Sequence, residues 1–222
     1  AQMLFSNKVN KIPIEFQKEM AKLALTLTFT TMHDNYFMFL KINYVMKEGV
    51  TSQAEMTKAE IELRRRQQKA IELLRKYVPG CENAFIARSS PTFCTRRGRS
   101  IICDYDISNE DILAGRHFED DIMHFGFHDS APKMHVGGDG TYGIPLRAIL
   151  VKNIDNLFAI GMMISTDYHA WMSTRNTVSC MGQGQAAGTC AALAAKSGVL
   201  PRKIPYSDLK DQLLADGVYL GE

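Results

Sequence analysis

The last third of the chain carries the pattern that most restricts its fold. An apolar run that ends in glycine, Asp155-Asn-Leu-Phe-Ala-Ile-Gly161, is followed by a polar loop and then by a Gly- and Ala-rich segment at residues 176–196. Glycine inside a helix costs about 1 kcal/mol relative to alanine, so several glycines together indicate that side-chain bulk must be absent there. The pattern predicts a buried strand at residues 156–160 and a helix at residues 176–196.

The start of this predicted helix suggests two interpretations. A helix N-terminus has unpaired N–H groups and the positive end of the helix dipole, which favour an anion or a polarised carbonyl. Ser173 and Thr174 place small hydroxyl groups there, and Arg175 adds a permanent charge. The alternative is close packing of the helix on a sheet without any ligand. Composition does not separate these two interpretations.

The remaining pattern predicts a mixed α/β (α+β) fold. A long helix near residues 53–77 can begin at a capping box that starts at Ser52 or Thr57, and Pro79-Gly80 ends it. Ser108 and Gly115 bound a short helix. Ser207 is predicted to cap a final helix that ends near Gly217. Further predictions are strands at residues 25–31, 36–45 and 122–127 and a loop at residues 129–143.

Composition excludes several classes of protein. The 222 residues carry a net charge of +2, which is too balanced for nucleic-acid binding or for an acidic membrane surface. The cluster Arg64-Arg65-Arg66 lies among Glu60, Glu62 and Glu72 on a predicted helix and is predicted to be a solvated helix face. No apolar run approaches the length of about 20 residues that a membrane span needs. The five cysteines form no CxxC pair, so we expect a reducing, cytoplasmic environment.

Three possible functional motifs are weak. Gly182-Gln-Gly184-Gln-Ala-Ala187 imitates a dinucleotide-binding turn, but that turn needs a preceding strand, and residues 174–181 make a poor one. No Gly-x-Ser-x-Gly nucleophile elbow is present. Four histidines lie within 19 residues but lack a familiar zinc spacing, so we expect no metal site. They are His117, His124, His128 and His135.

Five motifs, in order, resemble the FAD-dependent oxidoreductase family, which is related to the flavoproteins of fumarate reductase and succinate dehydrogenase. They are Arg96-x-x-Arg99 with Asp104-Tyr105, then Tyr142-Gly-Ile-Pro-Leu-Arg147, Asn156 to Gly161, Ser173-Thr-Arg175, and Gly184-Gln-Ala-Ala-Gly188. The similarity covers residues 40–216 and is to the C-terminal half of that family. It implies FAD as the cofactor and a Rossmann-type domain whose ADP-binding segment comes earlier in the family's sequence.

The resemblance also implies site residues. Gly161 and Met162 match the strand end beside the flavin ribityl chain, although the family often has arginine at the second position. The loop and helix start match residues that face the pyrimidine edge of the flavin, where a helix N-terminus stabilises negative charge. His169 is expected in that loop as a proton donor or acceptor, with a purely structural histidine as the alternative. The loop and helix-start residues are Ser173, Thr174, Arg175, Asn176 and Thr177.

Three arginines of the pattern, Arg96, Arg99 and Arg147, suit either an anionic substrate or structural ion pairs. With His169 and Arg175 as catalytic residues, the resemblance implies hydride or electron transfer between a small organic substrate and the flavin. Residues 1–150 would then be a substrate-side cap domain, and residues 151–222 the closing strand and helix of the FAD domain. We expect such a fragment to be inactive without the N-terminal FAD-binding half.

Two further possibilities remain open at this stage. The chain can be a non-catalytic interaction subunit that completes a flavin site with a separate partner chain, or, less readily, an independent nicotinamide-binding enzyme. The second requires the Gly182 motif to follow a strand. An exposed sheet edge would also favour a homo-oligomer.

Overall fold

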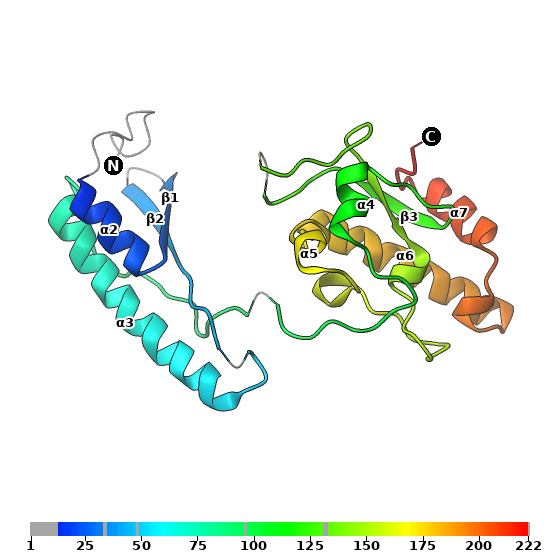
Figure 1. The fold of residues 1–222 in the computed structure, drawn as a ribbon, viewed down its shortest axis with the longest axis horizontal. Helices are drawn as coiled ribbons and strands as arrows, with labels where there is room; N and C mark the ends of the chain where they lie inside the picture. Colours follow the sequence, from blue (N-terminus) through cyan, green and yellow to red (C-terminus); the bar gives the residue numbers. More distant parts are fainter. Residues whose placement is uncertain (1–12, 33–34, 48, 96, 131–132, 222) are drawn as a thin grey trace. The chain divides into compact units, whose positions relative to one another are not determined.

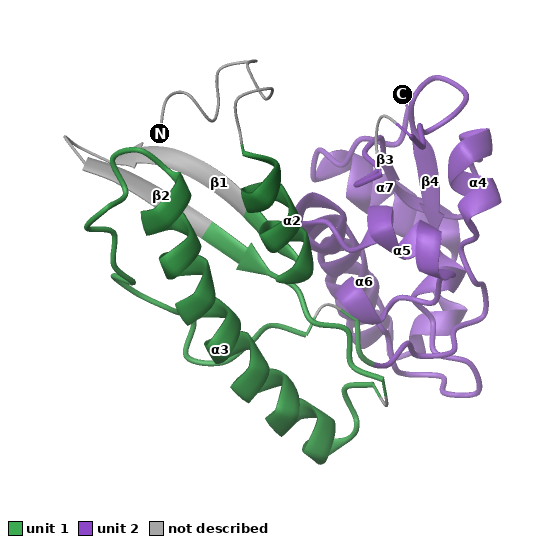
Figure 2. Cartoon of the chain, turned by 60° about the vertical axis from the view of Figure 1, so that its left-hand side comes forward, with its two compact units in different colours: residues 1–98 green, residues 99–222 purple. Residues whose placement is uncertain are grey.

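The structure, a computed structural model, describes residues 13–32, 35–47, 49–95, 97–130 and 133–221, with the side chains of residues 27–32 and 35–39 left aside. The chain divides into two compact units, residues 1–98 and 99–222 (Figure 2). Both contain helices together with a two-stranded antiparallel sheet. The predicted mixture of helix and strand is therefore confirmed.

The described part of the first unit contains helix α2 (Ile14–Lys22), strands β1 (Leu25–Met32) and β2 (Asn35–Ile42), and the long helix α3 (Gln53–Tyr77) (Figure 1). β1 and β2 form a hairpin in continuous register from Leu25↔Ile42 to Met32↔Asn35. The core of this unit is small and lies between the two helices, because Phe16 of α2 packs against the buried face of α3. The residues of α3 and its end that bury there are Ile71, Leu73, Leu74 and Val78.

Helix α3 begins where the sequence predicts, and the structure chooses between the two capping boxes. The Ser52 side chain accepts a hydrogen bond from the N–H of Glu55 at 3.3 Å, so Ser52 is the N-cap. The arginine cluster is not simply a solvated face. Arg64 binds the backbone carbonyls of Ser90 and Pro91, both at 2.9 Å, and Arg66 binds the carbonyl of Asn43 at 2.8 Å. These arginines tie neighbouring loops to the helix.

The second unit is built around strands β3 (Asp121–Phe125) and β4 (Tyr142–Pro145), which pair antiparallel with an irregularity between Asp121 and Met123. Helix α4 (Asn109–Ala114) has the predicted capping box of Ser108 and Asp111 and ends at Gly115, whose φ is +61°. A positive φ is accessible to glycine without a side-chain clash, which explains the helix stop.

Helix α6 (Thr177–Ser197) packs on β3, and the predicted Gly/Ala helix is thus confirmed. A Cβ atom at Gly182 would lie 2.4 Å from the Met123 sulfur, so a side chain there would force the end of the Met123 side chain on β3 to move. Gly188 has nothing within 4 Å of such an atom. The Gly182 motif lies inside the helix and follows another helix, not a strand, which contradicts a dinucleotide-binding turn.

Around α6 lie the remaining elements of the unit (Figure 1). Before it come the 3-10 turns η2 (Leu146–Ala148) and η3 (Gly161–Met163) and the short helix α5 (Tyr168–Thr174). After it come η4 (Pro201–Lys203) and helix α7 (Tyr206–Ala215), which packs on α6. The buried core of the unit includes Ile112, Ile122, Tyr142, Ile144, Ile149, Ala186, Leu209 and Leu213.

Three expectations from the sequence are corrected here. Residues 156–160 form no strand in a named sheet; they follow a turn and contribute one bridge, Leu150↔Phe158, with Leu157 half exposed. Ser207 is not the N-cap of α7, because Pro205 occupies that position without a side-chain cap, and the Ser207 hydroxyl binds Asp208. Residues 168–174 form the helix α5 where a loop was expected.

The boundary between the compact units lies at residues 98 and 99, whereas the predicted domain boundary was residue 150. Residues 99–150 belong to the second unit because backbone hydrogen bonds tie them to later segments. The N–H of Ile101 binds the carbonyl of Met163, and the N–H of Ile107 binds that of Ser165, both at 3.1 Å. None of the described helices is long and apolar enough to span a membrane.

Candidate functional site

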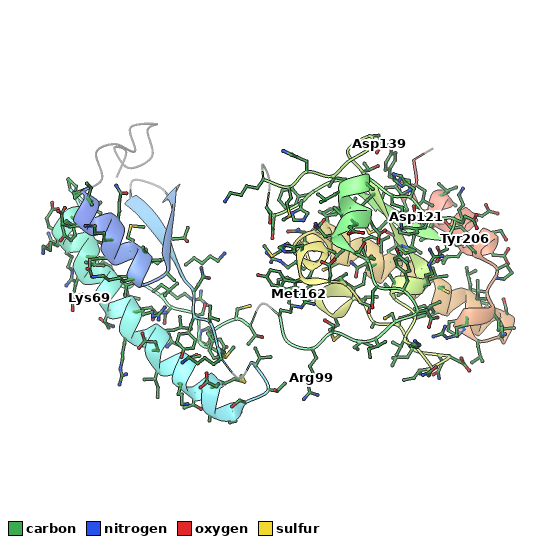
Figure 3. The ribbon with its side chains drawn as sticks, in the orientation of Figure 1. Lys69, Arg99, Asp121, Asp139, Met162 and Tyr206 are labelled. Carbon is green, nitrogen blue, oxygen red and sulfur yellow. The ribbon has the colours of Figure 1, made fainter. Side chains whose placement is uncertain are left out.

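The candidate site lies where η3, the end of α5 and the start of α6 meet. Gly161, the first residue of η3, has a φ of +73° and lies against the first turn of α6, since a Cβ atom there would be 4.0 Å from the Cys180 sulfur. Met162 follows with 44 % of its surface exposed, and its carbonyl accepts a hydrogen bond from the Trp171 indole at 3.3 Å. Figure 3 labels Met162.

A buried side chain that the sequence analysis did not single out joins these elements. The carbonyl of the Gln183 amide accepts the N–H of Gly161 at 2.7 Å. Its amide nitrogen donates to the Thr174 carbonyl at 3.2 Å and to the Ser179 hydroxyl at 3.0 Å. Gln183 is fully buried, so these hydrogen bonds replace its contacts with water and fix η3 and α5 on α6.

The hydroxyl groups of Ser173 and Thr174, which were expected to face a ligand, are both buried. Ser173 donates its hydroxyl proton to the Phe127 carbonyl, so the phenol of Tyr142, 2.7 Å away, must donate to the Ser173 oxygen. The hydroxyl of Thr174 is buried and has no hydrogen-bond partner among the described residues. These two side chains support the junction from inside, in contrast to the surface position predicted for them.

Arg175 ends α5, and its charge is paired. Its guanidinium forms an ion pair with Asp129 and lies 4.7 Å from the centre of the Trp171 ring, over its face. Only 12 % of the Arg175 side chain is exposed. The site therefore has less free positive charge than the sequence predicts, because Asp129 neutralises Arg175 locally.

The start of α6 is the most open part of the junction. The side chain of its N-cap, Asn176, turns back to the carbonyl of Ser173 at 2.8 Å and makes no hydrogen bond to the first turn of the helix. Thr177 and Val178, which follow, are exposed. The first N–H groups of the helix thus keep their capacity to bind an acceptor, and the helix dipole adds partial positive charge there.

Two histidines lie near this junction. His169 is exposed in the first turn of α5, with its ring beside that of Tyr168. His128 is buried, and its Nδ1 accepts the N–H of Ser130 at 3.0 Å. Burial lowers the pKa of His128, since the charged imidazolium is disfavoured away from water, so this ring is held neutral.

Of the three predicted substrate-side arginines, the described Arg99 and Arg147 make no hydrogen bond or ion pair with described residues of the junction. Arg147 forms an ion pair with Asp120 at 3.0 Å and lies over the rings of Tyr105 and Phe118. Those contacts match the alternative that Arg147 forms a structural ion pair. Arg99 is exposed (Figure 3), and Arg96 lies outside the described residues.

The structure separates the four histidines that the sequence placed together. His117 and His124 lie side by side, with ring centres 4.1 Å apart, and the carboxylate of Asp121 joins them. His128 is buried elsewhere and His135 is exposed. No spacing rule predicts the participation of Asp121, because the three residues come together only through the irregular part of β3.

The start of α6 presents backbone N–H donors next to exposed side chains at this junction. The chain matches the FAD dependent oxidoreductase family over residues 3–213 and therefore belongs to that family. The family's cofactor is FAD, and the resemblance noted in the sequence is confirmed at this level. No curated protein and no solved structure matches the chain significantly.

Proposed function

We propose that the second unit supplies the wall of a flavin site in an oxidoreductase that moves a hydride or an electron pair between a small organic substrate and FAD. The observation that carries this proposal is the open start of α6 beside Gly161. The Asn176 side chain caps the preceding helix instead of α6, which leaves N–H donors available to the carbonyl-rich pyrimidine edge of a flavin.

The residues present fit a flavin in part. Gly161 offers backbone without a side chain, and exposed apolar groups of Met162 and Val178 flank the donors, as a flat ring requires. The side chains of Ser173 and Thr174 are turned inward, so their proposed role is to position the junction and not to contact the cofactor. Asn176 and Thr177 remain proposed cofactor-binding residues.

When bound, FAD supplies the acceptor and donor of the electron pair. The start of α6 would stabilise negative charge on the pyrimidine edge through its N–H groups and dipole. His169, exposed on α5, is the proposed proton donor or acceptor for the substrate. Arg175 is proposed to hold α5 in place through Asp129 and Trp171, because its guanidinium is already engaged.

We further propose that the ADP-binding part of the site is provided by polypeptide outside these 222 residues, since no glycine-rich strand–turn–helix is evident in the sequence. The proposed roles remain a substrate-side cap for residues 1–150 and the closing part of the FAD domain for residues 151–222, although residues 99–150 fold with the latter in the second unit. Arg96, Arg99 and Arg147 remain proposed contacts to an anionic substrate, with Arg147 the least available because of its ion pair with Asp120. On this basis we expect the isolated chain to be inactive.

The test is an FAD titration followed by flavin fluorescence, with the chain alone and with the region encoded upstream in the same gene. A matched pair of variants sharpens it. Thr177→Glu adds a negative charge at the first residue of α6, where a carboxylate stabilises the helix itself. Gln185→Glu adds the same charge at an exposed position farther along α6.

We expect binding only in the mixture, a loss of about tenfold or more in affinity for Thr177→Glu, and little change for Gln185→Glu. Equal affinity for both variants would remove the helix start from the cofactor site. Absence of binding by the mixture would favour the second candidate, a non-catalytic interaction subunit. Tight binding by the chain alone would contradict a site divided between two polypeptides.

A further inference from the structure

A cluster of three potential metal ligands lies at the start of β3, apart from the residues of the proposed flavin site. It consists of His117 Nδ1, His124 Nε2 and one carboxylate oxygen, Oδ2, of Asp121. The two nitrogens are 3.1 Å apart, and they lie 3.4 and 3.3 Å from the carboxylate oxygen, respectively. All three atoms point to one small volume.

These separations are those of ligands around a first-row transition metal. Zn²⁺ binds histidine nitrogen and carboxylate oxygen at about 2.0–2.2 Å, so its ligands lie roughly 3.0 Å apart at right angles and about 3.4 Å apart at tetrahedral angles. The observed edges of 3.1 to 3.4 Å lie within this interval. Two histidines and one carboxylate are also a ligand set that divalent metals favour, with positions left for water or substrate.

The fold builds this cluster with a local irregularity. Residues three apart on a regular strand face opposite sides, so Asp121 and His124 should diverge. The register shift between Asp121 and Met123 turns them to the same side. The hydroxyl of Tyr206 on α7 binds the Asp121 carbonyl, and the N–H of His124 binds the Tyr219 carbonyl, which hold both ends of the irregular segment. Figure 3 labels Asp121 and Tyr206 on neighbouring elements of the second unit.

Space for the carboxylate depends on one glycine. Gly143, the cross-strand partner of His124, would carry a Cβ atom 1.8 Å from Asp121 Oδ2. The N–H of Gly143 also binds the Arg116 carbonyl at 2.9 Å, which brings the chain segment of His117 alongside β4. The absence of a side chain at this position is therefore a condition for the cluster.

The hydrogen bond on the far side of the His117 ring fits a tautomer with a lone pair on Nδ1, the atom that faces His124 and Asp121. Thr141 donates its hydroxyl proton to Asp139 at 2.8 Å, so its oxygen can accept from His117 Nε2 at 3.3 Å. With the proton on Nε2, the neutral ring carries a lone pair on Nδ1. A hydrogen-bonded acceptor behind a ligating histidine is a common support of metal sites.

The carboxylate lacks a sufficient partner in the protein. Asp121 is buried, its Oδ2 accepts the N–H of Phe118 at 3.1 Å, and its Oδ1 has no hydrogen-bond partner among the described residues. A buried charge without a counter-charge is unfavourable, and a cation would relieve it. His117, with 34 % of its side chain exposed, provides access from solvent.

We propose that His117, Asp121 and His124 form a binding site for one divalent first-row transition metal ion, with Zn²⁺ as the test ion. The rival explanation is a proton shared between the two imidazoles and the carboxylate, without any metal. The proposal does not depend on the flavin site, because none of its residues belongs to the η3–α5–α6 junction.

The experiment is a Zn²⁺ titration by calorimetry of the 222-residue chain, prepared without a histidine tag and freed of metal by chelation. A parallel Co²⁺ titration followed by visible absorption reports the ligand field directly. His117→Ala removes one ligand atom and Asp121→Asn removes the charge of the carboxylate, while His135→Ala removes an exposed histidine outside the cluster and is the matched control.

We expect one Zn²⁺ per chain, a loss of affinity of at least tenfold in His117→Ala and Asp121→Asn, and less than a twofold change in His135→Ala. If a ligand variant does not fold, NMR of the wild-type chain decides, because Zn²⁺ must then shift the ring signals of His117 and His124 but not that of His135. Absence of stoichiometric binding, or equal losses in the ligand and control variants, overturns the proposal in favour of the shared proton.

Discussion

The side-chain amide oxygen of Gln183, within helix α6, accepts a hydrogen bond from the backbone N–H of Gly161 at 2.7 Å. This bond holds the turn η3, which ends 14 residues before α6 begins, against that helix. The same side chain donates to the Thr174 carbonyl at the end of α5. One buried amide thus fixes three segments around the candidate flavin site.

Gln183→Ala should therefore be strongly destabilising. The variant leaves the Gly161 N–H and the Thr174 carbonyl without their partner and opens a cavity, at a cost of about 2–4 kcal/mol. Urea unfolding of the purified chain measures this loss in the free energy of unfolding. Gln185→Ala, an exposed glutamine on the same helix, is the control and should change the free energy of unfolding by less than about 0.5 kcal/mol. Similar values for the two variants would contradict the structural role of Gln183.

Alanine substitutions at Gly161 and Gly188 should change the stability of the chain in opposite directions. Gly161 has a φ of +73°, and its missing Cβ would make only an ordinary contact with the Cys180 sulfur at 4.0 Å, so Gly161→Ala carries only the backbone penalty, about 1–2 kcal/mol. Gly188 lies within helix α6 with nothing near its missing Cβ, so Gly188→Ala should stabilise the chain by about 0.5–1 kcal/mol. Thermal melting followed by circular dichroism distinguishes them, and a shift of the melting temperature in the same direction for both variants contradicts the prediction.

The five free cysteines should differ widely in reactivity. Cys94 is exposed, whereas burial raises the pKa of the Cys103 thiol to about 11. At pH 8 only about one in a thousand Cys103 side chains is then a thiolate, and access is blocked as well. We expect an aromatic disulfide reagent to label Cys94 fast and Cys103 only on unfolding. Cys94→Ser should remove the fast phase, and a fast phase that persists in this variant would place another thiol at the surface.

Acid should destabilise the chain partly through His128. Burial lowers the folded-state pKa of this histidine below its ordinary value near 6.5, so the unfolded chain binds a proton first as the pH falls. Stability from His128 is thus present above about pH 6.5 and decreases from there toward the folded pKa. His128→Asn keeps an acceptor for the Ser130 N–H but cannot titrate.

The pH dependence of unfolding between pH 7.5 and 5.5 should accordingly be shallower in His128→Asn than in the wild type. The comparison of slopes is necessary because His124 has a lowered pKa for the same reason and contributes in the same direction. His135→Ala, which removes an exposed histidine, should keep the wild-type slope. Identical slopes in all three proteins would mean that folding does not lower the pKa of His128.

Local signals in the sequence determined the ends of helices α3 and α4. Helix α4 needs only Ser108, Asp111 and Gly115, which satisfy its end groups within eight residues, and α3 needs only its cap at Ser52 and a regular apolar spacing. The family is also evident from motif order, and the match over residues 3–213 agrees with it. These features depend on neighbours along the chain, so they can be predicted without the fold.

Tertiary structure alone decided which side chains meet. The apolar run at residues 156–160 looked like a strand, but a strand needs a partner over its length, and here it makes a single bridge. Gln183 and Gly161 are 22 residues apart, and Asp121 reaches the side of His124 only through an irregular register. Ser173 and Arg175 were predicted to face a ligand. Instead, the Ser173 hydroxyl donates to the Phe127 carbonyl, and Arg175 forms an ion pair with Asp129. Such contacts are set by packing between distant segments, which sequence spacing does not encode.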